Sequence, residues 1–98
     1  MLKKRYIKRG KICKVTFYTP KQIGAETVAL VGDFNNWDEA ANPMQARKDG
    51  RFSAWLHLEA DSQYEFRYLV NGDEWHNDWE ADGYLPNPHG SDNCVVIT

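Results

Sequence analysis

The sequence has no long apolar run and no helical pattern, and each absence removes a class of protein. No segment approaches the roughly 18 consecutive apolar residues that a membrane-spanning helix needs. The start, MLKKRYIKRGK, has no apolar signal-peptide stretch, so we expect a cytoplasmic protein. With 98 residues the chain predicts one domain, far short of the roughly 250 residues of a (β/α)₈ barrel.

Cysteine is scarce as well. Cys13 and Cys94 stand near opposite ends of the chain, without CxxC spacing and without a neighbouring pair of histidines. This arrangement indicates neither a zinc site nor a redox centre, and we expect no cofactor. We expect both cysteines to be small buried apolar residues, and a reversible disulfide between them is the other interpretation.

The formal charge of −2 conceals an asymmetry along the chain. Residues 1–25 carry eight Lys or Arg and no acid, whereas residues 26–98 carry four basic and fourteen acidic side chains. The first ten residues predict a loose basic N-terminal arm, which leaves residues 11–98 as the folded domain.

Period-two alternation, typical of half-buried antiparallel strands, recurs along the sequence. The predicted strands are Ile12–Tyr18, Thr27–Val31, Phe52–Leu58, Tyr64–Val70 and the apolar run Cys94–Ile97. Turn signals at Asp49-Gly50 and Asn71-Gly72 flank these segments, and the four prolines fall between them. About six to eight short antiparallel strands predict an all-β, immunoglobulin-like sandwich. We assign six aromatic residues to its core: Phe17, Phe34, Phe52, Tyr64, Phe66 and Tyr68.

Three polar segments fit neither a core nor a simple turn: residues 32–38, 71–79 and 81–93. A tryptophan in such a segment either covers the core or offers a flat platform to a ligand. Trp37 and Trp75 stand among Asn and Asp residues, and Arg67 points to the same side of its strand as Trp75. Indole rings beside amide and guanidinium donors suit a sugar, which has an apolar C–H face and a rim of hydroxyls.

These residues also carry a resemblance. The chain contains the motif GDFNNW, the later motif FRYLVNGDEW and a polar loop that ends in DNCVV. With these motifs it resembles the family 48 carbohydrate-binding modules over about residues 11–98. That family includes the N-terminal early-set domains of isoamylases and branching enzymes and the glycogen-binding domain of the AMP-activated kinase β subunit. Small bacterial proteins consisting of an isoamylase early-set domain are also similar.

The resemblance implies an early-set β-sandwich that binds α-1,4-linked glucan such as glycogen, starch or maltooligosaccharide. By motif, Trp37 and Trp75 match the two stacking tryptophans of the kinase-type modules, and Arg67 stands where those modules have a sugar-binding Lys. Asp92 matches an Asn before the last strand, a departure because an ionised carboxylate only accepts hydrogen bonds. Early-set domains of several branching and debranching enzymes instead pack against a catalytic barrel. Docking onto an enzyme of glycoside hydrolase family 13 type is therefore the alternative function.

Other functions are less well supported by the residues. None of the fourteen carboxylates is singled out as a glycosidase pair, so we expect no enzyme. The acidic stretch 73–82 lacks the Asp-x-Asp-x-Asp-Gly spacing of a calcium loop, so we expect no metal. The basic segment could contact phosphates, but the acidic remainder opposes this within a Debye length of about 8 Å. We therefore expect no nucleic-acid or membrane partner.

Trp55 projects from the outer side of its strand beside His57. Three roles are open to this side chain: it is covered by a loop, it extends the sugar site, or it forms a protein contact. We expect the last of these, an interface with a second copy or with a glucan-metabolising enzyme.

Overall fold

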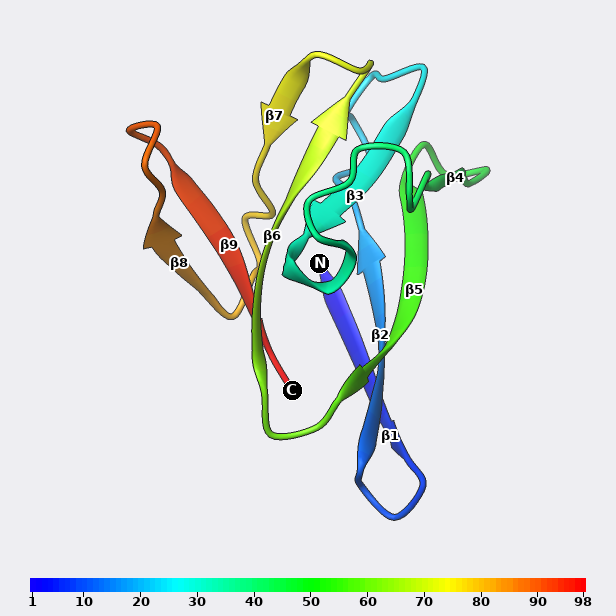
Figure 1. Ribbon diagram of the computed structural model, residues 1–98. Coiled ribbons are helices and arrows are strands. Elements are labelled where there is room, and N and C mark those ends of the chain that lie inside the picture. Colours follow the sequence, from blue (N-terminus) through cyan, green and yellow to red (C-terminus); the bar gives the residue numbers. More distant parts are fainter.

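Two antiparallel sheets face one another in the computed structural model, which describes residues 1–98 (Figure 1). Sheet A has the strand order β1-β2-β5-β4, and sheet B has the order β3-β6-β9-β8 with β7 also paired to β6. The strands are β1 Leu2–Ile7, β2 Ile12–Tyr18, β3 Val28–Gly32, β4 Gln45–Ala46, β5 Phe52–Glu59, β6 Gln63–Val70, β7 Glu74–His76, β8 Gly83–Pro86 and β9 Asp92–Ile97. The one helical segment is a 3-10 turn, η1, at Asp33–Asn35. The predicted all-β sandwich is confirmed, and no helix has the length and apolar character to cross a membrane.

Alternation along the strands decides which side chains fill the space between the sheets. The rings of Phe17 and Phe66 meet edge to face with centroids 5.0 Å apart, and Tyr68 continues the stack. Cys13 and Cys94 are free thiols that are fully buried, as expected of small apolar residues. The core comprises Cys13, Val15, Phe17, Val28, Leu30, Met44, Phe52, Leu58, Phe66, Tyr68, Val70, Cys94 and Val96. Phe34 and Tyr64 are partly buried and pack against this core.

The first residues form a strand, so the expectation of a loose basic arm is corrected. β1 pairs with β2 from Leu2 opposite Phe17 to Ile7 opposite Ile12. Pairing satisfies the backbone polar groups that face β2, and the side chain of Leu2 packs against the core. The many charges that suggested an arm belong on an edge strand, where they discourage pairing with other chains.

β6 is the central strand of sheet B and has a partner on each edge. One edge of β6 pairs with β3; the other pairs with β9 near its start and with β7 near its end. Arg67 lies where the partner changes from β9 to β7. The turn that follows has left-handed backbone at Asn71 (φ 52°) and Gly72 (φ 77°), which matches the predicted tight hairpin.

Candidate functional site

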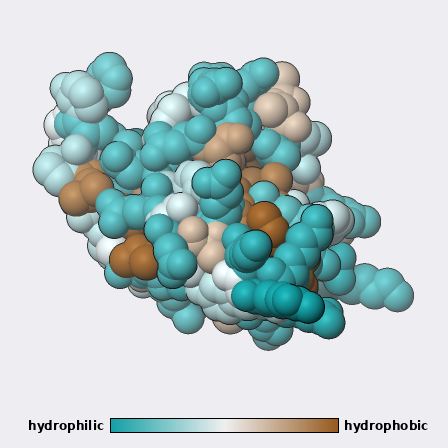
Figure 2. Space-filling model, turned by 60° about the horizontal axis from the view of Figure 1, so that its bottom comes forward, coloured by the Kyte–Doolittle hydropathy of each residue, from teal (hydrophilic) through white to brown (hydrophobic).

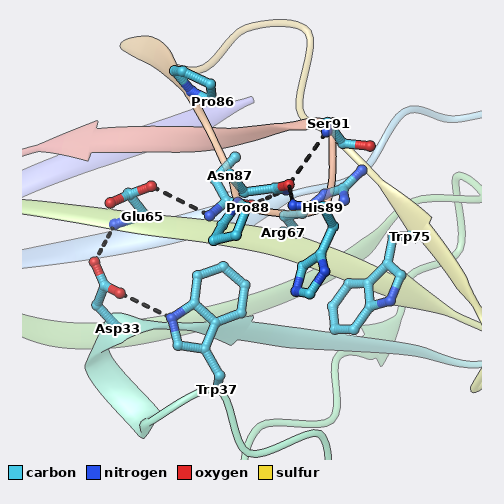
Figure 3. A pocket seen from close by; sticks show the side chains of 11 residues that line it. Asp33, Trp37, Glu65, Arg67, Trp75, Pro86, Asn87, Pro88, His89 and Ser91 are labelled. Carbon is cyan, nitrogen blue, oxygen red and sulfur yellow. Dashed lines mark hydrogen bonds between the residues drawn. The ribbon is translucent and has the colours of Figure 1, made fainter.

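A hollow of about 660 Å³ lies on the outer face of sheet B (Figure 3). It brings together three of the four residues singled out from the sequence: Trp37, Arg67 and Trp75. Figure 3 shows the rings of Trp37, Trp75 and His89 around one opening, with Asp33 and Glu65 to the side of Trp37. The complete lining is Asp33, Trp37, Glu65, Arg67, Trp75, Pro86, Asn87, Pro88, His89, Ser91 and Asn93.

The segment GDFNNW folds into a tight turn at the end of β3. Gly32 is required there because a Cβ would lie only 2.5 Å from the carbonyl oxygen of Glu65. Phe34 anchors the turn in the core, with its ring centroid 5.7 Å from that of Phe17. Asn35 closes the turn by accepting a hydrogen bond from the Gly32 N–H at 3.1 Å. Most of the motif therefore serves to deliver the tryptophan that follows it.

Trp37 is held in an unusual conformation at one side of the hollow. Its φ is +57°, in the left-handed region that bulky residues rarely adopt. The indole Nε1 donates a hydrogen bond to Asp33 Oδ1 at 2.9 Å, and Asp33 Oδ2 accepts one from the backbone N–H of Glu65 at 2.7 Å. Asp33 thus ties the indole to β6 and fixes its orientation before any ligand arrives.

Arg67 and Trp75 share this side of sheet B, as the alternation predicted. The guanidinium carbon of Arg67 lies 5.9 Å from the centroid of the Trp75 ring. Arg67 Nε donates to Asn77 Oδ1 at 2.8 Å, and Asn77 Nδ2 donates to the carbonyl oxygen of Asp92 at 3.0 Å. Only part of the guanidinium is used in this way, so its remaining N–H groups are free to meet a ligand.

The structure places Asp92 outside the hollow, and Asn93 takes the place expected for it. β9 begins at Asp92, two residues earlier than predicted. Cys94 is in the core, so alternation turns Asn93 to the outer face and Asp92 away from it. Asn93 Nδ2 donates to Glu65 Oε1 at 3.2 Å, and Asn93 lines the hollow. Asp92 contributes only its backbone carbonyl, through Asn77.

The loop between β8 and β9 belongs to the polar segment 81–93 and forms one wall of the hollow, although none of its residues from 87 to 91 was predicted as a site residue. Asn87 closes it, because its Oδ1 accepts hydrogen bonds from the N–H groups of His89 at 2.9 Å and Ser91 at 3.2 Å. Asn87 Nδ2 donates to Asn93 Oδ1 at 3.1 Å, which joins this wall to β9 of sheet B. The available signal was the Asn-Pro-His-Gly sequence, which predicts a tight turn but not its position beside two tryptophans.

A buried carboxylate, Asp78, fixes the segment that carries Asn77. Asp78 Oδ2 accepts a hydrogen bond from the Tyr68 hydroxyl at 2.7 Å and also contacts the amino group of Met1. The Asp78 N–H donates to the Cys94 sulfur at 3.1 Å. Burial, reinforced by the nearby carboxylate, raises the pKa of Tyr68 well above 10 and that of Cys94 to about 11. Both groups are therefore neutral near pH 7.

The hollow combines aromatic surfaces with donors and acceptors at their edges. Trp37 and Trp75 offer indole faces, Arg67 and Asn93 offer N–H groups, and the carboxylate of Glu65 accepts. Such a set suits a neutral polyhydroxylated ring, which needs an apolar face and hydrogen bonds around its rim. No group of three or more His, Cys, Asp or Glu side chains is arranged to hold a metal ion.

Comparison with known proteins agrees with this chemistry. The family of carbohydrate-binding module 48, the isoamylase N-terminal domain, matches residues 6–85. A 1,4-alpha-glucan branching enzyme GlgB of Aquifex aeolicus is 37% identical over 62 residues, which are 60% of this chain and 10% of the enzyme. GlgB of Prochlorococcus marinus is 28% identical over 60 residues, 61% of this chain and 8% of the enzyme. The chain thus spans about a tenth of these relatives, and it belongs to the carbohydrate-binding module 48 family.

Proposed function

We propose that the chain binds α-1,4-linked glucan in the hollow on sheet B by stacking Trp37 and Trp75 against glucose rings. Arg67 donates hydrogen bonds to the hydroxyls, and Asn93 rather than Asp92 supplies the fourth contact. Affinity for a short maltooligosaccharide lies in the micromolar to millimolar range, about −4 to −8 kcal/mol.

The observation that supports this proposal best is the fixed position of two indoles at one hollow. Trp37 is oriented by Asp33 before binding, and the cation–π contact with Arg67 restrains Trp75. Preorganised aromatic surfaces lose little conformational entropy when a ligand binds. The branching-enzyme relatives are named for action on 1,4-α-glucan, which agrees with the linkage proposed here.

We propose that binding is not followed by catalysis. The two carboxylates of the hollow already have structural partners: both oxygens of Asp33 accept hydrogen bonds, and Glu65 accepts one from Asn93. A glycosidase needs one carboxyl group to donate a proton and another to act as base or nucleophile. Release of reducing sugar from amylopectin above a buffer blank would contradict this part of the proposal.

Co-sedimentation with glycogen or insoluble starch tests the function, with cellulose as the control for linkage. We expect the wild-type chain to sediment with the α-glucans only, and Trp37→Ala and Trp75→Ala to remain in solution. Trp79→Ala is the matched control, because Trp79 is 88% exposed and lies outside the hollow. Sedimentation of the Trp37 and Trp75 variants at the wild-type level would refute stacking.

A second candidate function is docking onto a glucan-metabolising enzyme, and the distribution of charge favours it. Eleven of the twelve basic residues lie on sheet A or in loops next to it: Lys3, Lys4, Arg5, Lys8, Arg9, Lys11, Lys14, Lys21, Arg47, Lys48 and Arg51. The β1–β2 hairpin projects from the body (Figure 1), and seen from that end the surface is mostly hydrophilic with scattered apolar side chains (Figure 2). Such a hairpin would meet an acidic surface by charge, and Lys8→Glu with Arg9→Glu would abolish docking without affecting glucan sedimentation.

A further inference from the structure

We propose that Trp55 forms a second glucan platform on sheet A, separate from the hollow on sheet B. The choice of α-glucan as its ligand rests on the function proposed above. The platform itself is inferred from the exposure of this indole and from the polar side chains beside it.

Trp55 stands on the outer face of β5 with 56% of its surface exposed. It lies opposite Thr16 of β2, and its neighbours along the strand alternate between outer and inner faces. This position rules out two of the three roles considered from the sequence, while the expected role, a protein contact, stays a prediction. The indole is not covered by a loop, and it cannot extend the first hollow, which lies on the other sheet.

A second hollow, of about 320 Å³, opens beside Trp55 on the side of β4. Its polar lining consists of the side-chain amides of Asn42 and Gln45, the hydroxyl of Ser53 and the guanidinium of Arg47. Apart from Trp55, the rest of the lining is apolar: Ala41, Pro43 and Ala54. An exposed indole next to amide and guanidinium donors repeats the chemistry of the hollow on sheet B. A neutral sugar fits this lining, because each polar group can meet a hydroxyl while the ring covers the indole.

The contacts around Trp55 leave the β4 side free. Lys14 Nζ lies 4.5 Å from the centroid of the indole, and Lys14 belongs to β2, on the other side of β5. His57 packs against the same indole, with ring centroids 5.2 Å apart. Both contacts restrain the side chain, whereas the hollow lies toward β4.

The segment that forms the far wall is also fixed. The carbonyl oxygen of Asn42 accepts a hydrogen bond from Leu30 N–H at 2.9 Å, and Asn42 Oδ1 accepts one from Asn35 Nδ2 at 2.7 Å. Pro43 forms a bridge with Ala29 of β3. The Nδ2 of Asn42 is thereby left as a donor beside an indole that needs little rearrangement to bind.

Two platforms on opposite outer faces have a measurable consequence. The two sheets and the core between them separate the outer faces, so a trisaccharide stacked on one face does not contact the indole on the other. Short oligosaccharides would therefore bind two independent sites, and the smaller hollow on sheet A would be the weaker. A branched polymer can engage both faces, which raises apparent affinity without any new contact.

The test is a titration of the ¹⁵N-labelled chain with maltotriose, followed by the four tryptophan indole N–H signals. Each signal is assigned by its loss in the corresponding Trp→Phe variant, and cellotriose is the control for linkage. We expect the Trp37 and Trp75 signals to follow one isotherm and the Trp55 signal to follow a second, weaker one. The Trp79 signal, from a residue in neither hollow, stays in place.

Variants separate this proposal from the function on which it rests. In the Trp37→Ala, Trp75→Ala double variant, the Trp55 signal should still move, whereas in Trp55→Ala only the second isotherm should disappear. Trp55→Ala should also lower apparent affinity for glycogen about tenfold while leaving the first maltotriose site unchanged. A Trp55 signal that stays fixed while Trp37 and Trp75 move would overturn the second platform alone. Fixed signals at all four indoles would overturn both proposals.

Discussion

Trp37 has a backbone conformation that is unfavourable for its residue type. From this we predict how substitutions at this position change both the stability of the fold and the binding of glucan. At φ +57° any residue with a Cβ is strained, whereas glycine is not. We expect Trp37→Gly to be about 1 kcal/mol more stable than Trp37→Ala, since both lose the same ring. Both should lose maltoheptaose binding to the same extent. Urea unfolding compares the two variants, and equal stabilities would show that the turn is unstrained.

Substitution of Asp92 and of Asn93 tests which of the two contacts the ligand. The resemblance to the family points to Asp92, whereas the structure places Asn93 in the hollow. Asn93→Ala removes side-chain hydrogen bonds to Glu65 and Asn87, so affinity for maltoheptaose should fall by roughly 1 kcal/mol, about fivefold. Asp92→Ala keeps the backbone carbonyl that holds Asn77, and its affinity should stay within about twofold of wild type. Isothermal titration calorimetry measures both. The opposite order would restore Asp92 to the site.

Three of the four side chains predicted from the sequence line one hollow in the structure, and their contact with sugar stays a prediction. Trp37, Arg67 and Trp75 were predictable because rings and donors among polar residues indicate a ligand. Asp92 is predicted from the resemblance, as the match to an Asn before the last strand. Adjacent residues of a strand point to opposite faces, so the side chain of Asn93 rather than that of Asp92 lines the hollow.

At the scale of elements, the turn from β3 into η1 depends on the close approach of Gly32 to β6. Gly32→Ala would place a Cβ 2.5 Å from the Glu65 carbonyl oxygen, so we expect destabilisation of roughly 2–4 kcal/mol and displacement of Trp37. Gly83→Ala is the matched control, since its nearest contact would be Val95 Cβ at 3.8 Å. Thermal unfolding should show a large loss for the first variant and a small change for the second. Similar melting temperatures would contradict this packing argument.

Elements with a strong apolar alternation were predictable, and those dominated by charge or by few residues were not. β2, β5 and β6 lie within two residues of their predicted limits, because one face of each is buried. The sequence of β1 predicts an arm rather than a strand, because three consecutive basic residues hide the alternation that packs Leu2 inward. Asn87 closes the loop between β8 and β9 through local hydrogen bonds with His89, Ser91 and Asn93. The local sequence therefore predicts the turn, but it does not predict that the turn lies beside two tryptophans.

For the molecule as a whole, burial of Cys94 makes stability depend on pH in the alkaline range. The folded pKa of Cys94, about 11, exceeds its ordinary value of 9.0, so the folded state retains this proton longer than the unfolded state. Stability is fully present below the ordinary pKa and falls as pH rises from about 9 toward 11. Denaturant unfolding at several pH values measures the slope, which should be shallower in Cys94→Ala. An unchanged slope in that variant would assign the loss to Tyr68 and other groups.

The separation of charge between the sheets distinguishes the two candidate functions. A glucan is neutral, so its affinity should change by less than about twofold between roughly 20 and 500 mM NaCl. Docking of basic sheet A onto an acidic enzyme should weaken steeply over the same range. Calorimetry with maltoheptaose at both salt concentrations provides the measurement. A strong salt dependence would indicate that charge, not stacking, dominates binding.

The most direct test of the account is a crystal structure of the chain with bound maltoheptaose. We predict glucose rings against the indole faces of Trp37 and Trp75, with Arg67 and Asn93 within hydrogen-bond distance of the hydroxyls. An oligosaccharide bound elsewhere, with this hollow on sheet B empty, would contradict the central claim.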